Sequence, residues 1–288
     1  MTIVIAGGTG QLGRLLVARY RARGEDVRIL SRAPEHAGDM RDPAALDRAV
    51  AGARLVISAS SAFGIKGASP RLVDGEGNAN LIAAAEKHGV GRFVLVSVLR
   101  ASPDHPMELA RMKHLAEQRL IESKLSWTIL RPSTFIETFQ QILCAPLLEK
   151  GKTVVFGRAE NPVNFVSAHD VASFVELAAT EPSLAGEVID IGGPENLSLV
   201  QFVETFRSAV GANGSVKHIP RFMMRFLSQA ARPFQPTFAR MAQAGVLMDT
   251  TDMSFDASDL RRRFPAVPLT TVAEVARRDY GRSRTAEA

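Results

Sequence analysis

The stretch Gly7-Gly8-Thr9-Gly10-Gln11-Leu12-Gly13 follows an apolar run at residues 3–6 and opens a helical pattern at 11–23. Its spacing is Gly-x-x-Gly-x-x-Gly. We expect Gly7 to permit a tight turn, Gly10 to let the backbone approach a pyrophosphate, and Gly13 to pack the helix against the strand. The first N–H groups of the helix would bind phosphate oxygens, helped by the helix dipole. The expected phosphate loop therefore also includes Thr9, Gln11 and Leu12. A tight turn that binds no ligand is the alternative.

Short apolar runs alternate with amphipathic helical patterns through the first half of the chain. The runs are aliphatic on both faces, as in strands buried on both sides of a parallel sheet. This alternation predicts an α/β fold with a doubly wound parallel Rossmann sheet. The predicted strands are 3–6, 27–30, 55–58, 93–97 and 127–130, and the predicted helices are 11–23, 43–50, 78–88 and 106–123, the last with Pro106 at its first position.

The character of the chain changes beyond Gly151, where segments become short and interrupted by proline. Residues 187–191 read as one more core strand. We therefore predict a nucleotide-binding Rossmann domain of residues 1–150 plus 168–192. Residues 151–167 plus 193–288 form a predicted smaller C-terminal domain on the substrate side.

The end of the second predicted strand favours NADP(H) over NAD(H). An NAD site usually places Asp or Glu there to bond the ribose 2′-hydroxyl. This chain has Ser31 and Arg32 instead, and a hydroxyl with a guanidinium suits a 2′-phosphate. An ordinary surface cation is the alternative for Arg32. We expect Asp39 and Met40 to flank the adenine, and the helix that follows to be capped by Asp42. The third strand adds the expected cofactor contacts Ser58, Ala59 and Ser60.

Composition bounds the remaining possibilities. The chain has 288 residues, a net charge of +5 and one cysteine, Cys144. A single cysteine allows no intrachain disulfide and no thiolate metal cluster, and it fits a reducing compartment. The N-terminus does not resemble a signal peptide, no long apolar run occurs, and no dense Lys/Arg run would track a nucleic acid. We expect a cytoplasmic monomer or homodimer that acts on a small molecule, with no metal, nucleic-acid or membrane partner.

Several motifs together resemble the atypical short-chain dehydrogenases, in the NmrA-like and isoflavone-reductase-like branch. They are the glycine loop, 38–42, 92–97, Lys113, 127–132, 169–172 and 191–195, in the family's order. The resemblance implies a sheet of about seven strands, an active site at their carboxyl ends, and NADPH as the usual cofactor. The last ninety residues resemble the family only loosely.

Ordinary short-chain dehydrogenases use a Tyr four residues before a Lys, and this pair is absent. Lys113 stands at the family's position, but Leu109 precedes it by four. The resemblance makes Lys113 and Ser97 the candidate catalytic residues. Lys113 would bond the nicotinamide ribose or move a proton, and Ser97 would orient a substrate carbonyl. The alternatives are a solvated lysine paired with Glu117 at i+4 and a serine bonded to backbone.

The resemblance also places the loop Pro132, Ser133, Thr134 and Phe135 against the nicotinamide. An apolar substrate pocket lined by Phe135, Phe139 and Phe165 is our expectation, with burial in the core as the alternative for each.

The leading functional hypothesis is an NADPH-dependent oxidoreductase that transfers hydride to a conjugated carbonyl or quinone-like molecule. A non-catalytic NADP(H)-sensing regulator is the second hypothesis, with a Phe/Met-rich C-terminal surface as its interface. An NADP-dependent epimerase or dehydratase is disfavoured by the missing tyrosine.

Overall fold

The computed structural model describes residues 2–33, 35–65, 67–230 and 234–281. The chain divides into two compact units, one of residues 1–132 with 171–190 and one of residues 133–170 with 191–288. The expected boundary near residue 150 differs from this division. Residues 133–150 belong to the second unit because their apolar side chains, among them Phe139, Leu143 and Leu147, are buried in its core.

The first unit is built on a six-stranded sheet with the order β2-β1-β3-β4-β5-β9. Its strands are β1 (Thr2–Ala6), β2 (Asp26–Leu30), β3 (Ala53–Ser58), β4 (Arg92–Val96), β5 (Trp127–Pro132) and β9 (Glu187–Ile191). β1 pairs in parallel with both β2 and β3. The chain therefore moves to opposite sides of β1 after β1 and after β2, and such a switch point is where open α/β sheets bind ligands. The predicted parallel Rossmann sheet is confirmed.

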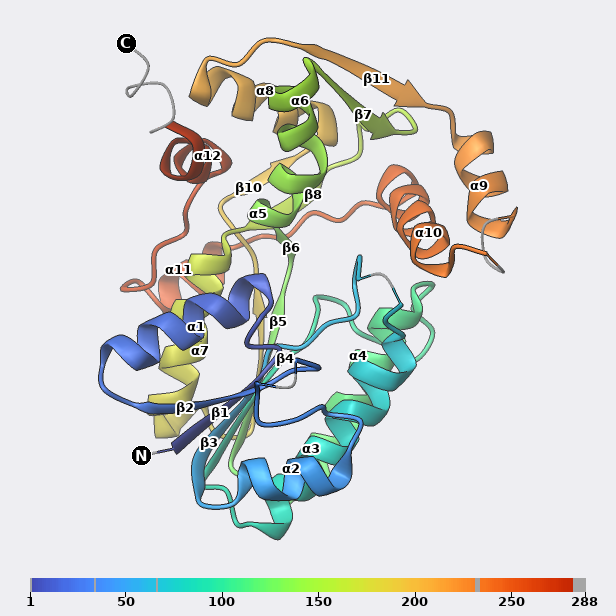
Figure 1. Ribbon diagram of the computed structural model, residues 1–288. Coiled ribbons are helices and arrows are strands. Elements are labelled where there is room, and N and C mark those ends of the chain that lie inside the picture. The colour runs from blue at the N-terminus through green and yellow to red at the C-terminus, as the bar shows by residue number, and fades with distance from the viewer. Residues whose placement is uncertain (1, 34, 66, 231–233, 282–288) are drawn as a thin grey trace. The chain divides into compact units, whose positions relative to one another are not determined.

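Helices cover both faces of this sheet. Figure 1 shows α1 (Gln11–Ala22) and α7 (Ala168–Thr180) on one face and α2 (Pro43–Val50), α3 (Asn78–Lys87) and α4 (Glu108–Ile121) on the other. Asp42 caps α2 by accepting from the N–H groups of Ala44 and Ala45, as predicted. α4 begins at Glu108, so the prediction that Pro106 opens this helix is wrong. The ring nitrogen of His105 instead accepts from the Met107 N–H, just before the helix.

Two local features differ from the sequence-based expectation. The sheet has six strands and not about seven, because the segment before Gly38 makes only an isolated parallel bridge between Leu30 and Gly38. Residues 71–77, for which the sequence predicts no element, form a π-helix, η1 (Arg71–Gly77), that runs directly into α3. A short 3-10 helix, η3 (Pro182–Leu184), precedes β9.

The second unit contains two small sheets. β6 (Thr134–Phe135), β8 (Val163–Val166) and β10 (Glu195–Leu197) form one, and β7 (Lys152–Phe156) pairs in parallel with β11 (Ser215–Ile219) in the other. The helical elements of this unit are α5 (Ile136–Phe139), η2 (Gln140–Cys144), α6 (Ala145–Lys150), α8 (Leu199–Val210), α9 (Arg221–Ala230), α10 (Pro236–Thr250), α11 (Ser258–Arg263) and α12 (Val272–Tyr280). Of the Phe/Met-rich segment that these helices include, residues 231–233 lie outside the described part.

The core of the second unit is aromatic. Phe165 packs against Phe139 and Phe202 with ring centroids 5.5 and 4.6 Å away, and all three rings are buried. The expectation that Phe139 and Phe165 line a substrate pocket is therefore corrected to the core alternative. Among the described helices of the chain, none is long and apolar enough to cross a lipid bilayer.

Candidate functional site

The glycine loop joins β1 to α1, and its glycines differ in what a side chain would meet. A Cβ on Gly7 would lie 2.7 Å from the Ser60 Cα, and the backbone there has φ +76°. A Cβ on Gly8 would lie 2.7 Å from the Ile29 side chain, and one on Gly13 would overlap the Gly7 carbonyl. Gly10 is different, because its Cβ would meet only the Gly7 oxygen, at 3.2 Å. Packing within the protein therefore explains why Gly7, Gly8 and Gly13 carry no side chain, but it does not explain the glycine at position 10.

The start of α1 is arranged for an anion. Gly10 is the N-cap residue, with φ −76° and ψ 176°, so it offers no side-chain cap to the first N–H groups of the helix. The first turn of α1 carries no acidic residue. N–H groups at a helix start have no intrahelical partner and lie at the positive end of the helix dipole. Together with the open position at Gly10, this arrangement fits the pyrophosphate of a dinucleotide.

Ser31 and Arg32 follow β2 at the same edge of the sheet. The Ser31 hydroxyl lies 2.5 Å from the Nδ1 of His36, a residue that the sequence analysis did not single out. Arg32 is exposed. The carboxylate of Asp39 is paired with the guanidinium of Arg41, with Oδ2 2.6 Å from Nη2. Hydrogen bonding by Arg41 lowers the pKa of Asp39, and the charge of Arg32 contributes to this shift. The negative charge of Asp39 is thus compensated by Arg41, which leaves Arg32 available to another anion.

Met40 and the residues at the end of β3 are largely buried, and the segment that follows β3 lies against Gly7. Met40 is buried, and its carbonyl accepts from the Asn80 side chain at 3.3 Å. Ser58 and Ser60 are buried as well, with their hydroxyls 3.3 Å apart, and the Ser58 hydroxyl donates to the side-chain Oδ1 of Asn78 at 2.5 Å. Ala59 donates its N–H to Ala6 at 2.9 Å. The segment 58–60 is therefore held tightly against the end of β1, where the cofactor loop begins.

Lys113 is a buried residue in this unit, with 2% of its side chain exposed. Its ammonium donates to the carbonyl oxygens of Ser60 and Val96, at 2.7 and 2.9 Å, and lies 3.2 Å from the Asp74 Oδ1. The alternative of a solvated lysine paired with Glu117 is wrong. Glu117 is itself buried and accepts from Arg131 at 2.9 and 2.6 Å. The Lys113 ammonium thus connects the carboxyl ends of β3 and β4.

Ser97 directly follows β4 and is also buried. Its N–H donates to the Leu130 carbonyl at 2.7 Å. Its hydroxyl has no hydrogen-bond partner among the described residues. A buried polar group without a partner costs about 1–3 kcal/mol, so it marks a place where a ligand or a water completes the bonding. The alternative prediction, that the Ser97 hydroxyl bonds to a backbone group, is wrong for the described residues.

The loop predicted to face the nicotinamide is divided between the two units. Pro132 ends β5 in the first unit, and Ser133, Thr134 and Phe135 begin the second. Within the second unit the Ser133 hydroxyl donates to the Asn164 side chain at 2.8 Å, and β6, made of Thr134 and Phe135, pairs with β8. Phe135 is half-buried. The role of these residues in binding stays a prediction.

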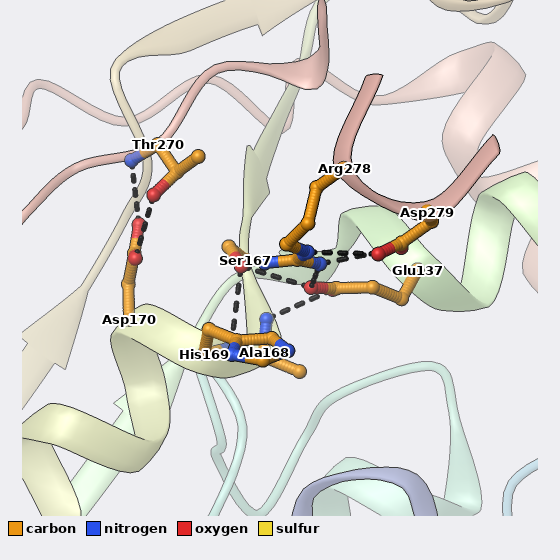
Figure 2. Close-up of polar contacts among 8 residues, drawn as sticks. All are labelled: Glu137, Ser167, Ala168, His169, Asp170, Thr270, Arg278 and Asp279. Atoms are coloured by element: carbon orange, nitrogen blue, oxygen red, sulfur yellow. Dashed lines mark hydrogen bonds and ion pairs between the residues drawn. The ribbon is translucent and has the colours of Figure 1, made fainter. Parts of the chain in front are cut away.

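The residues around the start of α7 hold the second unit together. Figure 2 shows the Glu137 carboxylate accepting from Ser167, from the Ala168 N–H and from Arg278, at 2.8, 2.8 and 3.0 Å. Asp170 accepts from the N–H and hydroxyl of Thr270, at 2.6 and 2.8 Å. Asp170 thus connects the start of α7 to the segment before α12.

Comparison with known proteins agrees with the glycine loop and the sheet. Residues 7–182 match a family model described as NAD(P)H-binding. The chain is 28% identical over 300 residues to the photosystem II assembly factor Ycf39 of Synechocystis, covering 98% of this chain and 91% of that protein. It is 29% identical over 221 residues to the NAD(P)H azoreductase of Xenophilus azovorans, covering 73% and 74%.

Among solved structures, the fold is similar to the NADPH-dependent quinone oxidoreductase QOR2 of Escherichia coli complexed with NADPH. The TM-score is 0.75 at 23% identity, over 96% of this chain and 99% of that one. The fold and the loop define a dinucleotide-binding Rossmann protein. More closely, the chain belongs to the NAD(P)H-binding family of atypical short-chain dehydrogenases.

Proposed function

We propose that this chain is an NADPH-dependent oxidoreductase that reduces a conjugated carbonyl or quinone-like molecule. The observation that carries the proposal is the buried hydroxyl of Ser97, which has no hydrogen-bond partner in the described part of the chain and lies at the carboxyl edge of the sheet that also bears the glycine loop. A NAD(P)H azoreductase among the relatives supports the same class of chemistry. The bound nicotinamide would supply hydride from its C4, and the protein would position and polarise the acceptor.

The proposed preference for NADPH rests on Arg32. Its guanidinium is exposed, and the carboxylate of Asp39 is paired with Arg41. A 2′-phosphate would therefore meet a cation at the end of β2 and no uncompensated anion from these residues. Ser31, whose hydroxyl already contacts His36, would add a second polar group.

The proposed role of Ser97 is to donate a hydrogen bond from its hydroxyl to the acceptor's oxygen. Charge grows on that oxygen as the acceptor is reduced, so a donor fixed there lowers the barrier. Lys113 has two proposed roles, which are bonding the nicotinamide ribose and supplying a proton. Either role requires its ammonium to exchange one of its present contacts with Ser60, Val96 or Asp74 for the ligand. The segment 132–135 is proposed to contact the nicotinamide, with Phe135 also beside the substrate.

The test is to follow the absorbance of NADPH with a panel of quinones and enones, for the wild type and for Ser97→Ala. We expect oxidation of NADPH that depends on the acceptor. Loss of one fixed donor to a developing oxyanion costs about 10²–10³ in rate. Ser97→Ala should therefore keep NADPH affinity while losing about that much turnover. A rate unchanged in Ser97→Ala would remove Ser97 from the chemistry, and no oxidation with any acceptor would contradict the proposed activity.

A second candidate is an NADP(H)-binding protein that acts by contacting another protein. The similarity to an assembly factor over nearly the whole chain favours it. Exposed aromatic side chains also favour it, because Phe222 and Phe226 on α9 are 71% and 69% exposed. The two residues are spaced i, i+4 on one helix face, and adjoining exposed apolar groups of this kind are typical of interaction surfaces. This candidate predicts NADPH binding without turnover, so the acceptor panel separates the two functions.

A further inference from the structure

The first unit contains a buried ion pair between Asp74 and Lys113. Asp74 and Lys113 are 0% and 2% exposed, and Asp74 Oδ1 lies 3.2 Å from the ammonium. Burial raises the pKa of Asp74, and the charge of Lys113 opposes this shift. Asp74 lies in the π-helix η1, and π-helical turns within helical segments occur frequently at functional sites.

Asp74 also makes hydrogen bonds with groups other than Lys113. Its Oδ2 accepts from the Ala62 N–H at 3.0 Å, so one carboxylate contacts both Lys113 and the segment after β3. Its own carbonyl accepts from the Asn78 side chain at 2.8 Å, and Asn78 in turn accepts from the Ser58 hydroxyl. The residues form a continuous buried polar network that begins in η1 and ends at the carboxyl ends of β3 and β4.

This network reaches the backbone on which the glycine loop rests. Lys113 donates to the Ser60 carbonyl, and a Cβ on Gly7 would lie only 2.7 Å from the Ser60 Cα. Ala59 and Ser60 thus lie against Gly7, and the segment 59–62 to which they belong is held by Lys113 at Ser60 and by Asp74 at Ala62. A displacement of this segment by even a fraction of an ångström changes the space available at Gly7.

We propose that Asp74 is a positioning residue that holds the Lys113 ammonium beneath the Ser60 and Val96 carbonyls and thereby fixes residues 59–62 as a wall of the cofactor site. The proposal rests on cofactor binding by the glycine loop and is independent of turnover. Two carbonyl oxygens alone do not neutralise a buried ammonium. Loss of the carboxylate therefore leaves an uncompensated cation, which draws in water or moves.

The test uses Asp74→Asn, which removes the charge and keeps the shape. The matched control is Glu117→Gln, which breaks a different ion pair of α4, that of the buried Glu117 with Arg131. Two quantities are measured for each variant, the NADPH Kd by fluorescence titration and amide hydrogen exchange of the cofactor-free protein. We expect Asp74→Asn to weaken NADPH binding by about tenfold or more, the loss of roughly one net hydrogen bond. Exchange should accelerate at Ala62 and its neighbours before it does elsewhere. Glu117→Gln should leave the affinity and the exchange of residues 59–62 near wild type.

The double variant Asp74→Asn/Lys113→Met covers the case in which the single variant does not fold, because it removes both buried charges. We expect it to regain thermal stability relative to Lys113→Met and still to show rapid exchange at residues 59–62 without cofactor. Protected amides at 59–62 in either variant, or wild-type NADPH affinity in Asp74→Asn, would overturn the proposal. A protein that binds NADPH but reduces no acceptor would leave it standing, since neither measurement requires turnover.

Discussion

Valine in place of Gly10 should abolish NADPH binding and leave the fold intact. The backbone of Gly10, at φ −76° and ψ 176°, is extended and open to any L-residue. A Cβ there would meet only the Gly7 oxygen at 3.2 Å, so a shift of a few tenths of an ångström relieves it. We therefore expect a small loss of stability in the cofactor-free protein.

The effect on binding should be much larger. Branched methyl groups at Gly10 would occupy the space through which a pyrophosphate approaches the first N–H groups of α1. Displacing the phosphates from two charge-assisted hydrogen bonds, each worth about 1.5–3 kcal/mol, weakens binding by about 3–6 kcal/mol. The NADPH Kd should rise at least about 100-fold.

Titration calorimetry with NADPH measures this loss, and thermal unfolding without cofactor measures the fold. Gly91→Ala is a matched control, because its Cβ would meet only the Arg54 carbonyl at 3.4 Å and it is not part of the loop. It should bind NADPH normally. Gly13→Ala should be unstable even without cofactor, since its Cβ would overlap the Gly7 carbonyl. Retained NADPH affinity in a folded Gly10→Val protein would refute the reasoning.

Three further substitutions test separate parts of the account. Arg32→Asp should weaken NADPH binding by ~1.5–3 kcal/mol with little effect on NADH, and equal losses for both cofactors would rule out a 2′-phosphate contact. Lys113→Met should lower the single-turnover rate at saturating NADPH by about 10²–10⁴ through loss of a proton-transfer group, whereas a near-normal rate with weaker binding makes Lys113 a ribose anchor. Burial raises the pKa of Tyr20 to about 12. The unfolded chain, with a tyrosine pKa of about 10, should lose this proton first, so the Tyr20 contribution to stability should fall by ~2–3 kcal/mol as the pH rises from about 10 to 12. In denaturant titrations over this pH range, the free energy of unfolding of Tyr20→Phe should lack that fall. A fall of the same size in Tyr20→Phe and in the wild type would contradict the assignment to Tyr20.

The sheet and the glycine loop could be predicted because their signals are local. Strands buried on both faces are continuous apolar runs, and the segments predicted at 3–6, 27–30 and 55–58 fall within β1, β2 and β3. The spacing of the loop glycines, Gly-x-x-Gly-x-x-Gly, is sufficient to predict the loop. The seventh strand that the resemblance implies is not in this sheet, and the chain at Gly38 makes a single bridge to Leu30.

The partners of charged residues could not be predicted, because they depend on tertiary contacts. The i+4 spacing in the sequence suggested Glu117 as the ion-pair partner of Lys113. In the structure the lysine pairs with Asp74, 39 residues earlier in the chain. Asp74 lies in the polar stretch Asp74-Gly75-Glu76-Gly77, which has no periodicity and reads as a loop. Phe139 and Phe165 were ambiguous for a related reason, since core and pocket use the same apolar residue types.

The most direct test of hydride transfer to an acceptor is a single-turnover experiment with NADPH deuterated at the transferred C4 position. The nicotinamide absorbance of the protein-bound cofactor is followed after mixing with a quinone or an enone. We predict decay that requires the acceptor, is slower with the deuterated cofactor than with unlabelled NADPH, and is strongly reduced in Ser97→Ala. Bound NADPH that stays reduced with every acceptor would contradict this prediction.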